Sequence, residues 1–158
     1  LRIRMLGVQV PPGAPSLENF PPSAMLPSMI NGKIRLGVSS CLLGEEVRFD
    51  GQHKLDRFLT ETVGQWVDWV PVCPEVECGL PIPRESMHLA GDPASPRLVT
   101  VRSGLDHTDR MEAWARRKLD ALADEDLGGF VFKSRSPSSG LQGIKVYSME
   151  GMPISRMV

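Results

Sequence analysis

Two of the three cysteines of this chain lie within residues 70–81, together with two glutamates and three prolines. The residues just before them, 66–72, are apolar enough to form a buried strand. Pro74 then ends regular strand pairing because proline has no backbone N–H to donate. Open α/β sheets bind their ligands at such strand ends. Two thiols beside a carboxylate therefore indicate a metal or cluster site with its own acid or base, and the alternative interpretation is a structural loop with incidental thiols.

The composition is that of an ordinary soluble globular domain. A chain of 158 residues fits one domain with its own core. The formal net charge of −1 provides no bulk attraction to nucleic acid or to an anionic membrane surface. No apolar run is long enough to span a bilayer. Three cysteines are an odd number in a chain without a convincing secretory signal, which argues against a disulfide framework and favours a reducing cytoplasm.

The two ends of the chain carry little chemistry. Residues 1–32 contain many prolines and no sustained helical or strand period, so they are predicted to be a disordered or loosely docked extension. Residues 33–158 are predicted to form the globular domain. The chain stops soon after its last predicted strand, which leaves room for an additional C-terminal domain absent from this sequence.

The first part of the globular domain is organised as a β-α-β unit. Residues 33–40 alternate and are rich in branched side chains, which is typical of a strand, and Cys41 follows directly. Apolar residues at helical spacing over 55–65 predict an amphipathic helix leading into the strand before Cys73. If the two strands are parallel neighbours, both thiols emerge at the same edge of the sheet. The predicted fold is a single α/β domain with a Rossmann-like parallel sheet and flanking helices.

The second half of the chain repeats this placement of polar residues after a strand. Strands are predicted over 97–102 and 144–147, a short helix within 80–89, and a longer helix over 106–124. A buried strand over 129–133 is followed by residues 134–140, which offer several serine hydroxyls and the guanidinium of Arg135. Small residues let backbone amides and hydroxyls surround a ligand. A flexible loop is the alternative, but the position at a strand exit favours ligand binding.

The cysteines suit an iron–sulfur cluster better than zinc. Zinc takes four protein ligands in structural sites, or three plus water in catalytic ones. No histidine has zinc-finger spacing, and the gap between Cys73 and Cys78 does not match the zinc deaminase signature. A 4Fe–4S cluster held by three cysteines leaves one iron open as a Lewis acid. Glu75 would then lie beside the cluster as a base, with Glu77 as its competitor because both point to one side of an extended loop.

Several separated motifs resemble one family. They are Ser40-Cys41-Leu42-Leu43-Gly44, Arg48-Phe49-Asp50-Gly51, Pro71-Val72-Cys73-Pro74-Glu75 and Phe132-Lys133-Ser134-Arg135-Ser136-Pro137-Ser138. Together they resemble the thiouracil desulfidase (TudS-like) family, over residues 33 to about 153. The resemblance implies a Rossmann-like domain with an oxygen-sensitive 4Fe–4S cluster held by three cysteines. It also implies that the free iron takes the sulfur of a thiolated pyrimidine while water replaces it at carbon, converting thiouracil to uracil without redox change.

The resemblance assigns roles to individual residues. Cys41 and Cys73 match two cluster ligands, and Glu75 matches the acid/base residue. Ser136, with Ser138 as the alternative, matches a serine near the substrate. Ser138, Ser139 and Arg135 are the predicted substrate-binding residues. This chain departs from the family pattern in one respect: Ser139 stands where many members have cysteine, and Cys78 stands where those members usually have glycine. Cys78 is therefore the predicted third ligand, close to the other two thiols.

The sequence also fits two other classes of function. One is a cluster- or zinc-containing structural module that partners a second domain, for example in nucleic-acid repair. The other is a sulfur-transfer enzyme that carries a persulfide on Cys78 and needs no metal. The natural substrate also stays open between a free thiolated nucleobase, a nucleoside and a tRNA, although the net charge does not indicate nucleic acid.

Overall fold

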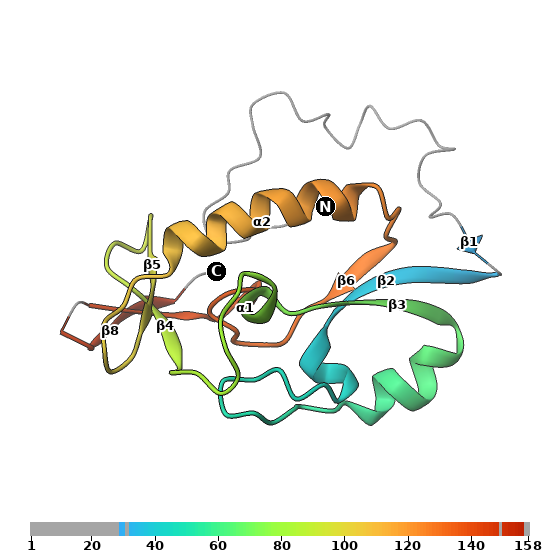
Figure 1. Cartoon of the computed structure of the whole chain (residues 1–158), viewed down its shortest axis with the longest axis horizontal. Helices are drawn as coiled ribbons and strands as arrows, with labels where there is room; N and C mark the ends of the chain where they lie inside the picture. The colour runs from blue at the N-terminus through green and yellow to red at the C-terminus, as the bar shows by residue number, and fades with distance from the viewer. Residues whose placement is uncertain (1–28, 31, 149, 157–158) are drawn as a thin grey trace.

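Two β-sheets and one long helix make up the computed structural model of the chain, which describes residues 29–30, 32–148 and 150–156 (Figure 1). The first sheet holds the strands β1 (Met29–Ile30), β2 (Lys33–Ser39), β3 (Val67–Val72) and β6 (Gly129–Val131). The second sheet holds the strands β4 (Met87–Ala90), β5 (Arg97–Thr100), β7 (Lys145–Tyr147) and β8 (Pro153–Arg156). Residues 1–28, most of the predicted N-terminal extension, lie outside the described part.

β2 is the central strand of the first sheet, and its parallel pairing with β3 is the one that the sequence predicted. It pairs with β3 from Ile34↔Val67 to Ser39↔Val72, and with β6 from Leu36↔Gly129 to Val38↔Val131. Since Leu36 pairs with both neighbours, β3 and β6 flank β2 on opposite edges. The chain therefore crosses first to one side of β2 and later to the other. The carboxyl end of β2 is thus the switch point at which open α/β sheets bind ligands.

The helix predicted over residues 55–65 forms only in part. A π-helical turn, η4 (Phe58–Thr62), continues into a 3-10 turn, η5 (Val63–Gln65). The residues before it bond instead to the 3-10 turn η3 (Ser40–Leu43): the backbone N–H groups of Lys54 and Asp56 donate to the carbonyls of Cys41 and Leu42 at 2.8 and 2.9 Å. These bonds hold residues 54–56 against η3 before the helical turns begin, and Phe58 is 63% exposed. The predicted length of this helix was wrong.

A second, mixed sheet was not predicted. Its strand order is β5-β4-β7-β8, in which only β4 and β7 run parallel. The sequence indicated strands at β5 and β7, but it assigned a short helix to the segment that forms β4. Leu89 of β4 is 1% exposed and pairs with Leu98 on one side and Val146 on the other. Leu98 belongs to the neighbouring strand, but Val146 lies far from Leu89 in the chain, so local patterns could not reveal the β4–β7 pairing that joins the sheet.

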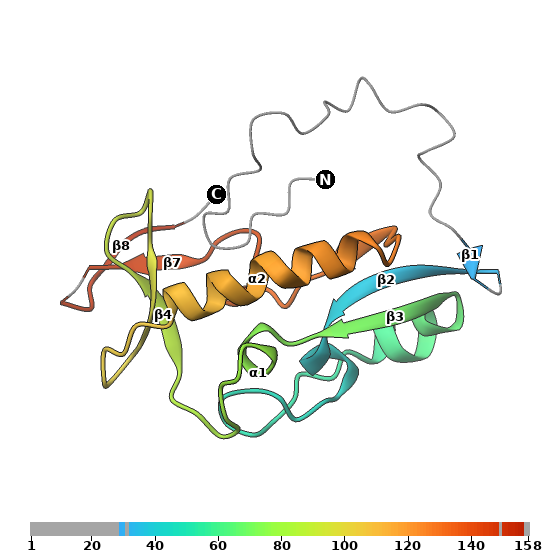
Figure 2. The same ribbon diagram turned by 45° about the horizontal axis from the view of Figure 1, so that its top comes forward.

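The core joins the two sheets through the helix α2 (Thr108–Ala123), which forms where a helix was predicted. Figures 1 and 2 show α2 lying along the molecule, with the parallel strands toward one end and the second sheet toward the other. The buried side chains of this core come from α2, β3, β4, β5 and β7 and from the residue before β7: Val72, Leu89, Leu98, Met111, Trp114, Ala115, Leu122, Ile144 and Val146. Among the described residues, no helix has the length and apolarity needed to cross a membrane.

Candidate active site

A cavity of about 280 Å³ opens at the carboxyl ends of all three parallel strands. Its wall is built by the segments that leave β2, β3 and β6, together with two surface loops. The residues that line it are Ser39, Ser40, Cys41, Val47, Arg48, Phe49, Val72, Cys73, Pro74, Glu75, Arg84, Ser86, Met87, Lys133, Arg135, Ser136, Pro137 and Ser139. Parallel pairing around β2 therefore brings together motifs that are far apart in the sequence.

Cys41 enters the cavity from the turn that follows β2. The exit of β2 is tied to that of β6, because the backbone N–H of Lys133 donates to Ser39 Oγ at 2.9 Å. Cys41 is half-buried, and burial raises the pKa of its thiol, while the positive charges of Lys133 and Arg48 act in the opposite direction. The thiol thus meets cationic groups that favour its deprotonated form.

Cys73 is the first residue beyond the last β2–β3 pair and caps the short helix α1 (Pro74–Glu77). Proline suits the first helical position, where its missing N–H costs no hydrogen bond. Cys73 is buried, and its Sγ lies 3.5 Å from Glu75 Oε2. Burial and the adjacent Glu75 carboxylate raise the pKa of Cys73 to about 12. A metal that binds this thiol must therefore displace a proton.

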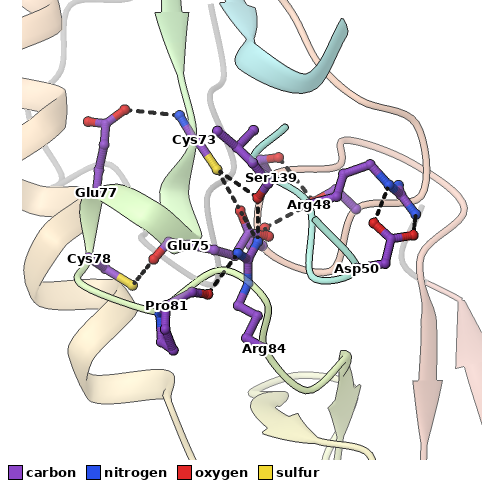
Figure 3. A network of polar contacts seen from close by, with 12 residues as sticks. Arg48, Asp50, Cys73, Glu75, Glu77, Cys78, Pro81, Arg84 and Ser139 are labelled. Carbon is purple, nitrogen blue, oxygen red and sulfur yellow. Dashed lines mark hydrogen bonds and ion pairs between the residues drawn. The ribbon is translucent and has the colours of Figure 1, made fainter. Parts of the chain in front are cut away.

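Glu75 is held by groups from two other parts of the chain, and Figure 3 shows its contact with Arg84. Ser138 Oγ donates to Glu75 Oε1 at 2.5 Å, and Arg84 Nη2 lies 3.9 Å from Glu75 Oε2. The side chain of Glu75 is 15% exposed, so it faces the cavity with little contact to bulk water. A carboxylate in this setting can accept a proton from a water or a ligand in the cavity.

The serine-rich segment after β6 folds tightly against Glu75. Ser136 Oγ lies 2.9 Å from Ser138 Oγ, and Ser139 Oγ donates to Ser136 Oγ at 3.1 Å. The turn closes where the Gly140 N–H donates to the Ser136 carbonyl at 2.8 Å, and a Cβ at Gly140 would meet that oxygen at 2.6 Å. Ser136 and Ser139 line the cavity, whereas Ser138 is 2% exposed and lies behind it, bonded to Glu75.

Arg135, the other predicted substrate-binding residue, lines the same cavity from a left-handed backbone conformation with φ 57°. It also lines a second cavity of about 400 Å³, next to His88, Lys145 and Tyr147. The two cavities share Met87, Arg135 and Pro137. Arg135 thus stands where they meet.

Cys78 and Glu77 lie apart from the residues that line the first cavity. In Figure 3 both point to one side of α1, away from the Glu75 carboxylate. Cys78 Sγ donates to the Glu75 carbonyl at 3.2 Å and packs against the core, and Cys78 is absent from the described residues that line the cavity. The structure thus brings Cys41 and Cys73 to one cavity but not Cys78. No group of three or more histidine, cysteine or acidic residues in the described part is arranged to hold a metal ion.

The prediction that Glu77 shares the side of Glu75 was wrong. Residues two apart point the same way in an extended loop. The segment is helical instead, and a helix turns each residue by about 100°, so Glu77 points nearly opposite to Glu75. Glu77 bonds to the backbone N–H of Cys73 at 2.9 Å and to Lys118 at 2.9 Å, outside the cavity.

Comparison with known proteins identifies the family. The model of the 2-thiouracil desulfurase family matches residues 36–156. The chain belongs to this family. It is 30% identical over 108 residues to the uncharacterized protein YbbK of Bacillus subtilis (strain 168), a match that covers 65% of this chain and 71% of YbbK. It also resembles the solved structure of a [4Fe-4S]-dependent thiouracil desulfidase, TudS, with a TM-score of 0.61, 33% identity, and 78% and 79% of the two chains covered.

Three basic residues of this 2-thiouracil desulfurase family member were not among the predicted site residues. Arg48, Arg84 and Lys133 line the cavity with Arg135, so basic groups outnumber Glu75, the one carboxylate among its described lining residues. Arg48 and Lys133 stand inside the sequence motifs, which was a signal for them. Arg84 had none, because only the fold brings its guanidinium to Glu75 and to the Val47 carbonyl, which lies 3.0 Å from Nη2.

Proposed function

We propose that this protein removes sulfur from thiolated pyrimidines such as 2-thiouracil, with a 4Fe–4S cluster bound in the cavity. The observation that carries the proposal is the convergence of Cys41, Cys73 and Glu75 in one cavity at the switch point of the sheet, in a member of the 2-thiouracil desulfurase family. The similarity to TudS, a [4Fe-4S]-dependent thiouracil desulfidase, supports the choice of cofactor.

The donors in the cavity suit such a cluster at two positions. Cys41 and Cys73 offer thiolate ligands, and the surrounding arginines and lysine offset the negative charge that thiolates bring. Cys78 is our proposed third ligand, because iron–sulfur clusters prefer thiolate to the hydroxyl that Ser139 offers. This assignment requires the Cys78 side chain to leave its contact with the Glu75 carbonyl and turn toward the cavity. When bound, the cluster supplies an open iron that acts as a Lewis acid toward sulfur.

Glu75 acts in this proposal as the general base. It takes a proton from a water molecule, whose oxygen bonds to the ring carbon while the carbon–sulfur bond breaks. The sulfur leaves as hydrosulfide and the carbon ends as a carbonyl, so no electrons are gained or lost. The hydrogen bond from Ser138 fixes one oxygen of Glu75, and the other faces Cys73 and Arg84. Fixing the base in this way favours proton transfer in one geometry.

The remaining polar residues bind and orient the pyrimidine. The Ser136 and Ser139 hydroxyls and the Arg135 guanidinium line the cavity and can donate hydrogen bonds to ring carbonyl and nitrogen atoms. The basic groups around them, Arg48 and Lys133, stabilise the negative charge that develops on sulfur as it leaves.

Anaerobic purification and reconstitution test the proposal. The full chain should take up iron and sulfide in the ratio of a 4Fe–4S cluster, show the broad visible absorbance of such clusters, and release sulfide from 2-thiouracil. Cys41→Ser should lose both iron and activity because it removes a cavity thiol. Binding of zinc in place of iron, or sulfide release by the metal-free chain through a trappable adduct on Cys78, would contradict the proposal.

A further inference from the structure

Glu77, which lies outside the cavity, bonds to both backbone groups of Cys73, with its carboxylate to the N–H and with its own N–H to the carbonyl. The Cys73 N–H donates to Glu77 Oε1 at 2.9 Å, and the Glu77 N–H donates to the Cys73 carbonyl at 2.9 Å. Cys73 lies one position beyond the last residue of β3 that pairs with β2, so strand pairing no longer holds its backbone. Glu77 therefore replaces the sheet as the partner of this residue.

The second oxygen of Glu77 ties this contact to α2. Glu77 Oε2 lies 2.9 Å from Lys118 Nζ, and the two side chains are 31% and 23% exposed. α2 is itself fixed in the core through Met111 and Trp114, which are 1% and 5% exposed. The pair thus connects Cys73 to the best-packed helix of the molecule.

α1 depends on such a connection because it is one turn long. Isolated helices of this length are not stable in water. Cys73 provides no side-chain hydrogen bond at the N-cap, and Pro74 provides no N–H. The same turn carries Glu75 into the cavity, so whatever orients α1 orients both the Cys73 thiol and the Glu75 carboxylate.

We propose that Glu77 and Lys118 are positioning residues for the desulfuration site, holding Cys73 and Glu75 in place from outside the cavity. The inference rests on the proposed function insofar as it gives Cys73 and Glu75 their chemical roles. Neither Glu77 nor Lys118 lines the cavity, so neither touches the reacting atoms. Their effect passes through the backbone of Cys73.

Variants of the two residues separate the hydrogen bond from the ion pair. Glu77→Leu removes both, Glu77→Gln keeps an acceptor for the Cys73 N–H, and Lys118→Met removes only the ion pair. The exchanged pair, Glu77→Lys with Lys118→Glu, restores the ion pair but leaves the Cys73 N–H without its acceptor. Glu112→Gln is the matched control, because Glu112 forms an ion pair with Arg116 on the same helix, with 3.6 Å between Oε2 and Nη2.

The first measurement is hydrogen exchange at the Cys73 amide in the full chain before reconstitution. Exchange should be faster in Glu77→Leu and in the exchanged pair, close to wild type in Glu77→Gln, and unchanged in Glu112→Gln. This readout is independent of metal. If wild type takes up no iron, the proposed function fails while the exchange data still decide on the contact between Glu77 and Cys73.

The second measurement compares the reconstituted proteins. Glu77→Leu should lower kcat by about 10- to 100-fold with little change in KM, since a small misplacement of reacting groups costs about that much. The visible circular dichroism of its cluster should change as well, and Glu77→Gln should recover most of kcat. The proposal would be overturned if Glu77→Leu showed unaltered exchange at the Cys73 amide together with wild-type kcat. It would also be overturned if lower thermal stability were the only change in this variant. If Glu77→Leu does not fold, Lys118→Met tests the ion pair alone: kcat should fall by less than in Glu77→Leu, and a wild-type kcat would overturn the proposal.

Discussion

Glu75 and the neighbouring serines differ in whether their side chains line the cavity. The carboxylate lines the cavity, while Ser138 bonds to it from a position that is 2% exposed. Ser136 and Ser139 are bonded to each other and line the wall. At the scale of single residues, the proposed base and the serine that holds it are thus distinct from the serines that line the cavity.

Glu75→Gln should keep the cluster and lower desulfuration by at least about 100-fold, the usual contribution of a general base. Glutamine retains an oxygen that can accept from Ser138, so the loop should stay in place, but an amide does not accept a proton from water. Sulfide release from 2-thiouracil and iron content, measured on the same sample, check this prediction. Glu61→Gln, at an exposed position, is the control. Wild-type sulfide release by Glu75→Gln would show that another group is the base.

Cys78→Ser and Ser139→Ala distinguish the two candidates for the third cluster ligand. We expect Cys78→Ser to lose cluster iron, because a hydroxyl is a poor substitute for thiolate. Ser139→Ala should retain the iron, since its hydroxyl bonds to Ser136 and is not required for ligation. Both variants are compared by their iron and sulfide content and by electron paramagnetic resonance of the reduced protein. The reverse pattern would assign the third position to Ser139, which already lines the cavity.

At the scale of elements, the central strand of the parallel sheet depends on one close approach. Gly37 of β2 pairs with Phe130 of β6, and the Phe130 ring lies across it. A Cβ at Gly37 would come within 2.1 Å of Phe130 Cδ2, well inside van der Waals contact. Only glycine lets the ring lie there, stacked on Phe132 with 4.3 Å between the centroids.

Gly37→Ala should therefore destabilise the protein by about 1–3 kcal/mol, the usual cost of forcing an added methyl into packed side chains. Urea unfolding followed by circular dichroism measures the change. Phe130→Leu removes the ring, so the double variant should lose less stability than the sum of the two single variants. Additive losses would mean that the ring does not limit the size of residue 37.

The start of α2 should make stability depend on pH through Asp106. Partial burial of Asp106 would by itself raise the pKa of its carboxyl group. Hydrogen bonds from Arg97 and Thr108 outweigh this effect and hold that pKa below its usual value. A carboxyl group whose pKa is lowered in the folded state stabilises the fold above its unfolded pKa, and this contribution is lost as the pH falls through the folded pKa.

Asp106→Asn should consequently lower the free energy of unfolding by about 0.5–1 kcal/mol at neutral pH, a modest value because Arg97 is half-exposed and solvent screens the pair. Asparagine still accepts from the Thr108 N–H, which lies 2.8 Å from Asp106 Oδ1, so the helix start is kept. The difference from wild type should shrink as the pH is lowered from about 5 to about 2. Thermal unfolding over this range measures it, and a constant difference would contradict the assignment.

At the scale of the whole molecule, one core holds two sheets of different topology. The parallel sheet contributes Val72, the mixed sheet contributes Leu89, Leu98 and Val146, and α2 packs against both. The cavity lies between the strand exits of the first sheet and the loops that lead into the second. Its shape therefore depends on the packing that joins the sheets.

Met111→Ala tests how far α2 holds the two sheets together. Met111 of α2 is 1% exposed in the shared core, and truncating a fully buried side chain of this size costs about 2–5 kcal/mol. Met152→Ala is the control, because Met152 is 64% exposed. Guanidinium unfolding should show a large loss for the first variant and almost none for the second. Similar small losses for both would mean that α2 is not the main link between the sheets.

The sequence by itself determined the parts of the site that follow from local pattern and parallel topology. Alternating residues 33–40 and the apolar residues 66–72 indicated two strands, and a thiol follows each of them. Parallel strands end at the same edge, so the meeting of Cys41 and Cys73 with the serine-rich segment after β6 could be expected from the order of elements. Proline after Cys73 marked the strand end for the same local reason.

Only the tertiary structure decided where the side chains beyond the strand ends point. Residues 74–77 wind into a helix that contacts α2 through Glu77 and Lys118, and this rotation sends Glu77 and Cys78 away from Glu75. Arg84 reaches the cavity through a loop whose course no local pattern records. The mixed sheet likewise depends on the pairing of β4 with β7, which are distant in the chain. Local periodicity reports which residues prefer a strand or a helix, whereas these features arise from contacts between segments far apart in the chain.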